Sequence, residues 1–346
     1  MRKKFLGVVM VLVMVIVMLS AGFAVAAGGT MNGSGTEADP YQVTDAADLA
    51  KIGDGAPGTH YKLMNNITLS RSFSTIDSFK GILNGNGKTI SGLDVLLTVT
   101  YDDTITTGSK QVRTTEGALF NEIAQSGLVY NLTLSNPKYN NTFKDIPSSH
   151  NGTYTFKSGV FAVTNRGVID SVTVTGLNFD GSPNKTSTCE SYIIASDVGI
   201  FVFDNYGSIV NSTISGSVKF GDSDPSYSKY SGGLGGIAVV NCGQIANIHC
   251  SLNLTVDYWS GFTGATLTFF SPGVALNYGT MYNVWVDGSI TNDSTLAISK
   301  NNMATRGFLC GQNTAGGYIS NSYGNCTVSG RYIEKTIAAD QDLGSN

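Results

Sequence analysis

The sequence predicts an all-β fold: a repeat β-solenoid, in which stacked β-arches build a parallel β-helix of about six to seven rungs with a short N-terminal helix. One short phrase recurs along the chain at intervals of 36 to 40 residues. Each copy joins a continuous apolar run to a stretch in which apolar and polar residues alternate. Composition agrees, because 42 glycines and only 13 % charged residues are typical of strands joined by many turns.

Residues 1–27 are expected to be a secretory signal peptide. Three basic residues precede an apolar run over residues 5–19, and small residues at 24–26 fit a cleavage site. The alternative is an uncleaved membrane anchor, because the run is nearly long enough to span a bilayer. No second apolar span follows, so the rest is expected to be secreted to the cell surface without a membrane span.

The remaining chain divides into a solenoid over residues 28–330 and a short polar tail over residues 331–346. Within the first part, "TDAADLAKI" predicts a short helix over the first rung. The tail contains no apolar segment and no recognisable sorting motif, and it does not resemble a capping element of a solenoid. An uncovered end would expose unpaired strand edges to another chain.

The repeated phrase aligns on a glycine. The glycines are Gly127, Gly167, Gly207, Gly243, Gly279 and Gly317, and Gly87 begins a looser copy. Two residues before them stand Gln125, Asn165, Asn205, Asn241 and Asn277, with Asn313 displaced by a two-residue insertion. Two residues after them stand Val129, Ile169, Ile209, Ile245, Met281 and Ile319. Four residues after them stand Asn131, Ser171, Asn211, Asn247, Asn283 and Asn321.

Each copy predicts one β-arch. Runs such as "GVFAV" before the glycine indicate a strand buried on both faces, and "GSIVNSTIS" indicates a strand with one buried face. The Asn-x-Gly phrase between them predicts a sharp bend in which the glycine adopts a positive φ. Arches stacked about 4.8 Å apart would place the asparagines in a hydrogen-bonded ladder. The alternative, a sandwich of hairpins, does not require a phrase that recurs so regularly.

The phrase "G-(apolar)-N-x-G-x-I-x-N" resembles the GLUG-type repeat of bacterial and archaeal cell-surface proteins. The segments "GSGTEADPYQVTDAADLAKIG" and "FKGILNGNGKTISGL" are similar to the start of such right-handed parallel β-helix domains. The resemblance covers nearly all of residues 33–330, although the return loops here are longer. It implies a β-helix at the cell surface but no particular activity, because such repeats occur in adhesins, surface-layer proteins and fused enzymes.

Charge and acid placement argue against several function classes. Three of the 21 basic residues lie in the signal, so 18 basic and 25 acidic residues remain, a net charge of −7. Without a basic patch, nucleic acid is not an expected partner. A β-helix lyase or hydrolase would align acids on one face. The nearest approach to such a column is Asp180, Asp222 and Asp257, whose offsets from their glycines do not share one face, and Asp170 and Asp204 stand in other columns.

No cofactor, metal or catalytic residue is predicted. Asp222 and Asp224 could hold calcium, but a polar turn is the preferred interpretation. His60, His150 and His249 lack metal-ligand spacing. The expectation is therefore that the protein is not an enzyme, with a polysaccharide-degrading β-helix as the least favoured alternative.

Five cysteines are disulfide candidates in an exported chain: Cys189, Cys242, Cys250, Cys310 and Cys326. The number is odd, so at least one lacks a partner inside the chain. One interpretation is one or two internal bridges plus a buried thiol, and the other is bridging between subunits. Cys250 and Cys326 fall in non-adjacent rungs and should be too far apart to bridge directly.

Ten Asn-x-Ser/Thr sequons are possible N-glycosylation sites, about half of which an Asn- and Thr-rich chain would contain by chance. They are Asn32, Asn66, Asn131, Asn140, Asn151, Asn184, Asn211, Asn253, Asn292 and Asn325.

These features together predict a secreted structural protein that self-assembles, through β-sheet stacking and disulfides, into a layer, sheath or filament of the cell envelope. In type it is similar to the amyloid-like, disulfide-reinforced sheath proteins of methanogenic archaea. The alternative is a surface adhesin that binds glycans through loop aromatics such as Tyr227, Tyr230, Tyr258 and Trp259. A helix covering the N-terminal end would oppose stacking at that end.

Overall fold

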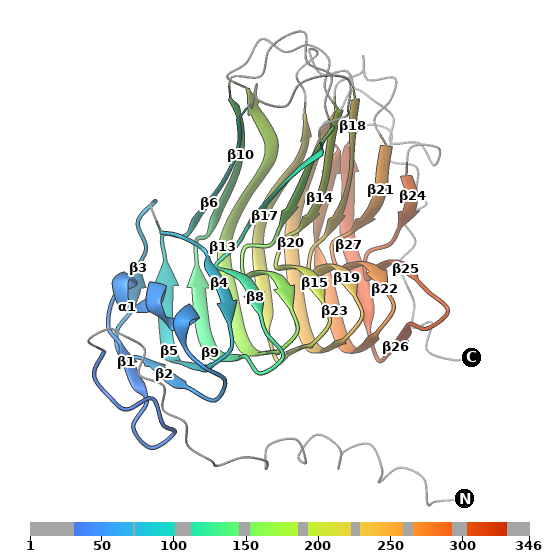
Figure 1. The fold of residues 1–346 in the computed structure, drawn as a ribbon. Helices are drawn as coiled ribbons and strands as arrows, with labels where there is room; N and C mark the ends of the chain where they lie inside the picture. The colour runs from blue at the N-terminus through green and yellow to red at the C-terminus, as the bar shows by residue number, and fades with distance from the viewer. Residues whose placement is uncertain are drawn as a thin grey trace, which may run out of the picture.

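The computed structural model describes residues 31–71, 73–100, 112–144, 153–185, 193–222, 229–258, 266–292 and 303–330. The protein is an all-β β-solenoid whose coils follow one another from the N-terminal to the C-terminal end (Figure 1). The predicted signal peptide and polar tail lie outside the described residues. In the part of the chain that is described, no helix has the length and apolar character needed to cross a membrane.

The strands form three sheets, here named A, B and C, and all their pairings are parallel. Sheet A contains β1 (Tyr41–Val43), β2 (His60–Leu63), β3 (Ile67–Thr68), β5 (Ile82–Ser91), β6 (Asp94–Thr100), β9 (Leu128–Ser135), β10 (Lys138–Lys144), β13 (Val168–Lys185), β16 (Ser208–Val210), β17 (Thr213–Asp222), β20 (Gln244–Tyr258), β23 (Thr280–Asn292), β26 (Tyr318–Ser320) and β27 (Tyr323–Gly330). Sheet B contains β4 (Ile76–Phe79), β8 (Phe120–Ile123), β12 (Ala162–Asn165), β15 (Val202–Asn205), β19 (Ala238–Asn241), β22 (Val274–Asn277) and β25 (Cys310–Asn313). Sheet C contains β7 (Val112–Gly117), β11 (Thr153–Ser158), β14 (Ile193–Gly199), β18 (Lys229–Gly235), β21 (Thr266–Ser271) and β24 (Met303–Arg306).

Strand register follows the sequence repeat. Each full coil runs through sheet C, then sheet B, then sheet A. In sheet A, Ile209 pairs with Ile169 on one side and Ile245 on the other, and Met281 and Ile319 continue the column. The same sequence position therefore occupies the same place in successive coils.

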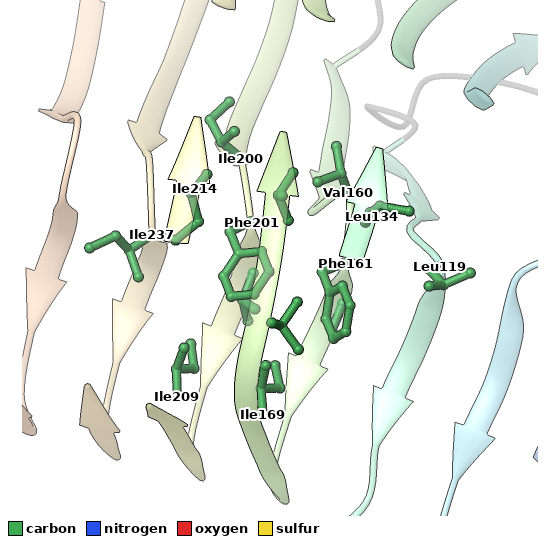
Figure 2. Close-up of a cluster of buried hydrophobic side chains, with 14 of the residues drawn as sticks. Leu119, Leu134, Val160, Phe161, Ile169, Ile200, Phe201, Ile209, Ile214 and Ile237 are labelled. Carbon is green, nitrogen blue, oxygen red and sulfur yellow. The ribbon is translucent and has the colours of Figure 1, made fainter. Parts of the chain in front are cut away.

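The core lies between sheet A and the strands of sheets B and C. Figure 2 shows Ile169 and Ile209 of sheet A with Phe161 and Phe201, which come directly before sheet B strands. Sheet B is buried on its other face as well, where a second cluster contains Ala118, Val163, Phe203, Val239 and Ala275. Burial on both faces explains why the runs before the glycine are apolar without alternation.

The N-terminal end is covered by the predicted helix, α1 (Ala46–Lys51), and a 3-10 turn, η1 (Ile52–Asp54) (Figure 1). The Asp45 carboxylate accepts hydrogen bonds from the backbone N–H groups of Ala47 and Asp48 and so caps the helix. Leu49 and Ile52 are fully buried in the main core. At this end the last apolar layer is thus closed by the chain itself.

Candidate binding surface

The asparagine two residues before the glycine forms a buried inner ladder. Asn165 Nδ2 donates to Asn205 Oδ1 at 2.8 Å, Asn205 donates to Asn241 at 2.8 Å, and Asn241 donates to Asn277 at 2.7 Å. Asn277 donates to Asn313 at 2.7 Å. The first four side chains are fully buried, so these amide bonds lie in an environment that penalises any unpaired polar group.

The ladder begins one coil later than the alignment on Gly127 would place it. Ile123, and not Gln125, pairs with Asn165, because the bend before Gly127 is two residues longer than in the next coil. Ile123 offers no side-chain donor. Asn165 Oδ1 is accordingly a buried acceptor without a hydrogen-bond partner among the described residues.

The recurring glycine has a different role from the predicted one. None of the described glycines at positions 167, 207, 243 and 279 has a positive φ. A Cβ atom at Gly207 would instead overlap the carbonyl oxygen of Gly167, and one at Gly243 would overlap that of Gly207. Close approach between successive coils, not backbone handedness, requires glycine here. At Gly317, after the two-residue insertion, a Cβ would overlap the Asn313 side chain.

The left-handed residue lies four positions later and carries an outer ladder. Asn211, Asn247, Asn283 and Asn321 have φ between 49° and 56° and are exposed on sheet A, as are Asn131 and Ser171 in the earlier coils. Asn247 Nδ2 donates to Asn211 Oδ1 and Asn283 Nδ2 donates to Asn247 Oδ1, both at 2.9 Å, and Asn321 donates to Asn283 at 3.3 Å. In the outer ladder each asparagine donates to the coil before it, whereas in the inner ladder each donates to the coil after it. The last donor of the outer ladder, Asn211 Nδ2, donates to Asp170 Oδ1 at 2.9 Å.

Several exposed aromatic side chains lie beside the outer ladder. Among the described residues the exposed aromatics are Tyr282, Trp285, Tyr318 and Tyr323 on sheet A, and Tyr206 and Tyr278 in the bends between sheets B and A. Tyr282 precedes the ladder residue Asn283 and Trp285 follows it by two positions. Trp285 pairs with Tyr323 in the next coil and with His249 in the previous one. We name His249, Trp285 and Tyr323 the aromatic row, and Asn247, Asn283 and Asn321 the amide row.

The aromatic row is continuous along the solenoid. The ring centroids of His249 and Trp285 are 4.9 Å apart, and those of Trp285 and Tyr323 are 5.2 Å apart. His249 Nε2 lies 3.0 Å from Asp287 Oδ2 in the next coil. The sequence signal for this surface is "NYGTMYNVWVDG", where the left-handed Asn283 places both Tyr282 and Trp285 outward. Strict alternation would have turned one of them inward.

The predicted loop aromatics Tyr227 and Trp259 lie outside the described residues, as do the side chains of Tyr230 and Tyr258.

The cysteines divide into one exposed thiol and buried positions. Cys242 is exposed in the arch bend and unpaired; Cys250 and Cys326 are buried and unpaired, and Cys310 is buried. Burial raises the pKa of Cys250 well above its usual range and that of Cys326 to about 12. Buried thiols react slowly in the folded state, so Cys242 is the described cysteine best placed to bridge subunits, and the pairing of the cysteines stays a prediction. Cys189 lies outside the described residues.

The acids that come nearest to a catalytic column in the sequence stand in different register columns of the strands. In the strand register, Asp180 lies opposite Lys219, Asp222 lies opposite Tyr258, and Asp257 lies opposite Gly221. Asp170 lies on sheet A and Asp204 on sheet B. His60 and His249 are far apart in the coil order, and His150 and Asp224 lie outside the described residues. Over the described ranges, no three His, Cys, Asp or Glu side chains come together in a way that could hold a metal ion.

Six of the sequon asparagines are described and exposed: Asn32, Asn66, Asn131, Asn211, Asn253 and Asn325. Asn211 donates to Asp170 within the outer ladder, and Asn253 Oδ1 accepts from Ser289 Oγ at 2.8 Å. The side chains of Asn140, Asn151, Asn184 and Asn292 lie outside the described set. Glycosylation stays a prediction.

Comparison with known proteins gives partial similarities. No protein-family model matches the chain, so the GLUG-type resemblance stays a prediction. The chain is 31 % identical to halomucin of Haloquadratum walsbyi over 164 residues, which is 43 % of the chain. The matched part is 2 % of halomucin's length. A Bacteroides ovatus protein proposed to be an immunoglobulin A1 protease superposes with a TM-score of 0.43 at 14 % identity, over 86 % of each chain. At that TM-score, the likeness decides neither fold nor activity.

Proposed function

We propose that this chain is a secreted, non-enzymatic structural protein of the cell surface, whose solenoid of six to seven rungs assembles into a layer, sheath or filament. The observation that carries the proposal is the state of the C-terminal end. Among the described residues, β24, β25 and β27 are the last strands of sheets C, B and A, and each pairs with a neighbour on one side only. Such edges favour pairing with another chain. The partial similarity to halomucin supports a surface role.

The two ends of the solenoid differ in how far they are covered. At the N-terminal end α1 and η1 pack beside β4 over part of the core, although β6 and β7 also pair on one side only among the described residues. We infer that the less covered C-terminal ends of two copies meet each other. Such a contact is isologous, because both copies use the same end surface and a two-fold axis relates them. The facing edge strands of the two copies then run antiparallel. Backbone hydrogen bonds from three sheets would then add to the apolar contact.

An end-to-end contact gives only a pair, so a layer requires a second link. Cys242 supplies a candidate, because its thiol is exposed in the arch bend at the side of the solenoid. Partial burial, and then the Asp204 carboxylate, raise the pKa of Cys242. Since the thiolate is the reactive form, we expect disulfide formation between copies to be slow at neutral pH and faster at alkaline pH.

Lysines on the last strand test the end contact. Asn325 and Thr327 are exposed on β27, and in an isologous contact their lysine replacements would repel one another. In sedimentation of the mature chain with reductant, we expect the parent to associate and Asn325→Lys/Thr327→Lys to be monomeric. The matched control Thr173→Lys/Thr175→Lys, on the same face of β13, should associate like the parent. A monomeric parent at high concentration, or an edge variant that associates equally, would contradict the proposal.

Non-reducing gels test the second link. We expect covalent dimers of the parent that disappear with reductant and in Cys242→Ser, but persist in Cys326→Ala. A single monomer band from oxidised parent protein would rule out the disulfide link. A dimer band that persists in Cys242→Ser would assign it to another cysteine.

A further inference from the structure

We propose that the amide row and the aromatic row form a binding site for an uncharged polysaccharide that lies along the solenoid axis. This site uses the outward face of β20, β23, β26 and β27, whereas the proposed assembly contact uses the free edges of β24, β25 and β27. It would let an assembled or single solenoid attach to a glycan matrix.

Aromatic rings stand exposed beside the amide row. Trp285 is 44 % exposed and Tyr323 46 %, and Tyr282 and Tyr318 are both more than half exposed. Such rings present flat apolar faces on which a ligand can stack, and their polar tips can form hydrogen bonds.

The rings flank the amide row on both sides. Along the strand, the amide row has Tyr282 on one side and Trp285 on the other, three residues and therefore about 10 Å apart. Along the solenoid axis, Asn247, Asn283 and Asn321 succeed one another at the strand spacing. Each donates one Nδ2 hydrogen to its neighbour and keeps a second hydrogen for a ligand hydroxyl. A polar floor with aromatic sides fits sugars, which present hydroxyl groups at their edges and C–H groups on their faces.

Charged residues are sparse on this surface. In the sequences of β20, β23, β26 and β27 the carboxylates are Asp257, ten residues beyond Asn247 on β20, and Asp287, whose Oδ2 lies 3.0 Å from His249 Nε2. One carboxylate beside the two rows would attract a basic polymer only weakly and would not attract an acidic one. The site therefore favours a ligand recognised by hydrogen bonds and ring contacts.

The size of the surface argues against a second copy as its occupant. From Tyr282 to Asp287 the strand covers roughly 17 Å, and three coils cover roughly 10 Å between the outer two, so the rows span on the order of 200 Å². A stable protein interface buries about 800 Å² per partner. A single sugar chain needs less, and a repeat of about one sugar unit per coil would place successive sugars over successive coils.

Affinity electrophoresis of the mature chain tests the site, with hydroxyethylcellulose, galactomannan or polygalacturonate in the gel. We expect at least one of the two neutral polymers to retard the parent and polygalacturonate not to. Trp285→Ala and Tyr323→Ala should each weaken retardation about tenfold. Thr173→Ala, in the same register column of an earlier coil, should bind like the parent. Melting temperatures check that every variant is folded.

Fluorescence gives an independent readout. The chain has two tryptophans, so Trp259→Phe leaves Trp285 as the single reporter. Neutral polymer should shift its emission and protect it from acrylamide quenching. The proposal is overturned if neither neutral polymer binds, if only polygalacturonate binds, or if Trp285→Ala binds undiminished. It is also overturned if Trp285→Ala abolishes self-association without glycan, since the occupant would then be a second copy. Loss of association in the β27 lysine variant with retained glycan binding would separate this site from the assembly contact.

Discussion

The N-terminal and C-terminal halves of the solenoid differ in where most of their described aromatic residues lie. The largest fully buried side chains are Tyr61, Phe79, Phe120, Tyr139, Phe161, Phe179 and Phe201. Among the described residues, the exposed aromatics lie from Tyr206 onward. Ile237 and Leu309 take the core positions that Phe161 and Phe201 hold earlier, Phe308 stays buried, and Tyr282, Trp285, Tyr318 and Tyr323 stand exposed on sheet A.

One register column shows the change directly. Thr89, Thr133, Thr173 and Thr213 pair in succession through the earlier coils. The same column continues as His249, Trp285 and Tyr323. Threonine suits an outward strand position that serves only the fold. Because the strand register is the same in both halves, the fold alone does not require the change to rings, and the proposed glycan site gives it a reason.

A charge in the C-terminal core should produce the largest effect. Ile245 is fully buried in the stacked column of sheet A. We expect Ile245→Asp to cost several kcal/mol or to prevent folding, because it buries a carboxylate without a partner. Ile245→Val, the matched control, should cost about 0.5–1.5 kcal/mol. Chemical denaturation measures both. A variant that unfolds like the parent would mean that the C-terminal half lacks the closed core of the N-terminal half.

A matched pair of aromatic truncations addresses the comparison itself. Phe161 is fully buried, with ring centroids 5.6 Å from Phe120 and 5.2 Å from Phe201. Phe161→Ala should lower the free energy of unfolding by about 3–5 kcal/mol through cavity formation. Trp285→Ala should change it by about 1 kcal/mol or less. Equal losses in the two variants would refute the division between packing and surface aromatics.

A substitution in the inner asparagine ladder should cost more stability than one in the outer ladder. Asn241→Ala removes one buried partner on each side and leaves Asn205 Nδ2 and Asn277 Oδ1 without their ladder bonds. Each orphaned group costs about 1–3 kcal/mol. Asn247→Ala removes exposed bonds that water replaces, and its cost should come mainly from the left-handed backbone, about 1 kcal/mol. Thermal unfolding of both variants measures the difference, and a larger loss for Asn247→Ala would reverse our assignment of the inner ladder as structural.

Alkaline pH should weaken both halves by a smaller, graded amount. Burial raises the pKa of Tyr61 to about 12 in the N-terminal half and that of Cys326 to about 12 in the C-terminal half. A raised folded-state pKa means that the native protein holds the proton more tightly than the unfolded chain. The related stability is therefore intact below about pH 9, and it is lost as pH rises toward 12.

Melting temperatures between pH 8 and 11 test this expectation. The decline with pH should be shallower in Cys326→Ala, in which the buried thiol is absent. Tyr61→Phe should flatten only the part above about pH 10. Parallel declines in parent and variants would show that other groups control alkaline unfolding.

The sequence predicted the repeat, its register and the N-terminal helix because these depend on local periodicity and on the match between copies. Ile209 and Ile245 could be stacked from their spacing alone. The handedness at Asn211 and the close approach at Gly207 could not be separated, because both residue types favour turns and only the distance between coils distinguishes the two demands.

The aromatic surface was also beyond the sequence. A single left-handed residue at Asn283 changes which face of the sheet the following side chains occupy. A prediction from strict alternation of buried and exposed residues does not include such a change. The sequence pointed to loop aromatics, whereas the described surface lies on the strands of sheet A. The position of Asn321 four residues after its glycine would have been the signal for a repeated kink.

Hydroxyl-radical footprinting of the mature chain tests the division between inner and outer aromatics most directly, because oxidation of aromatic side chains follows their exposure to solvent. Tyr282, Trp285 and Tyr323 should oxidise rapidly, whereas Phe120, Phe161 and Phe201 should react slowly. Adding the neutral polysaccharide should protect Trp285 and Tyr323 and leave the inner set unchanged. Similar oxidation rates in the two sets would contradict the account, as would protection that falls on the N-terminal coils.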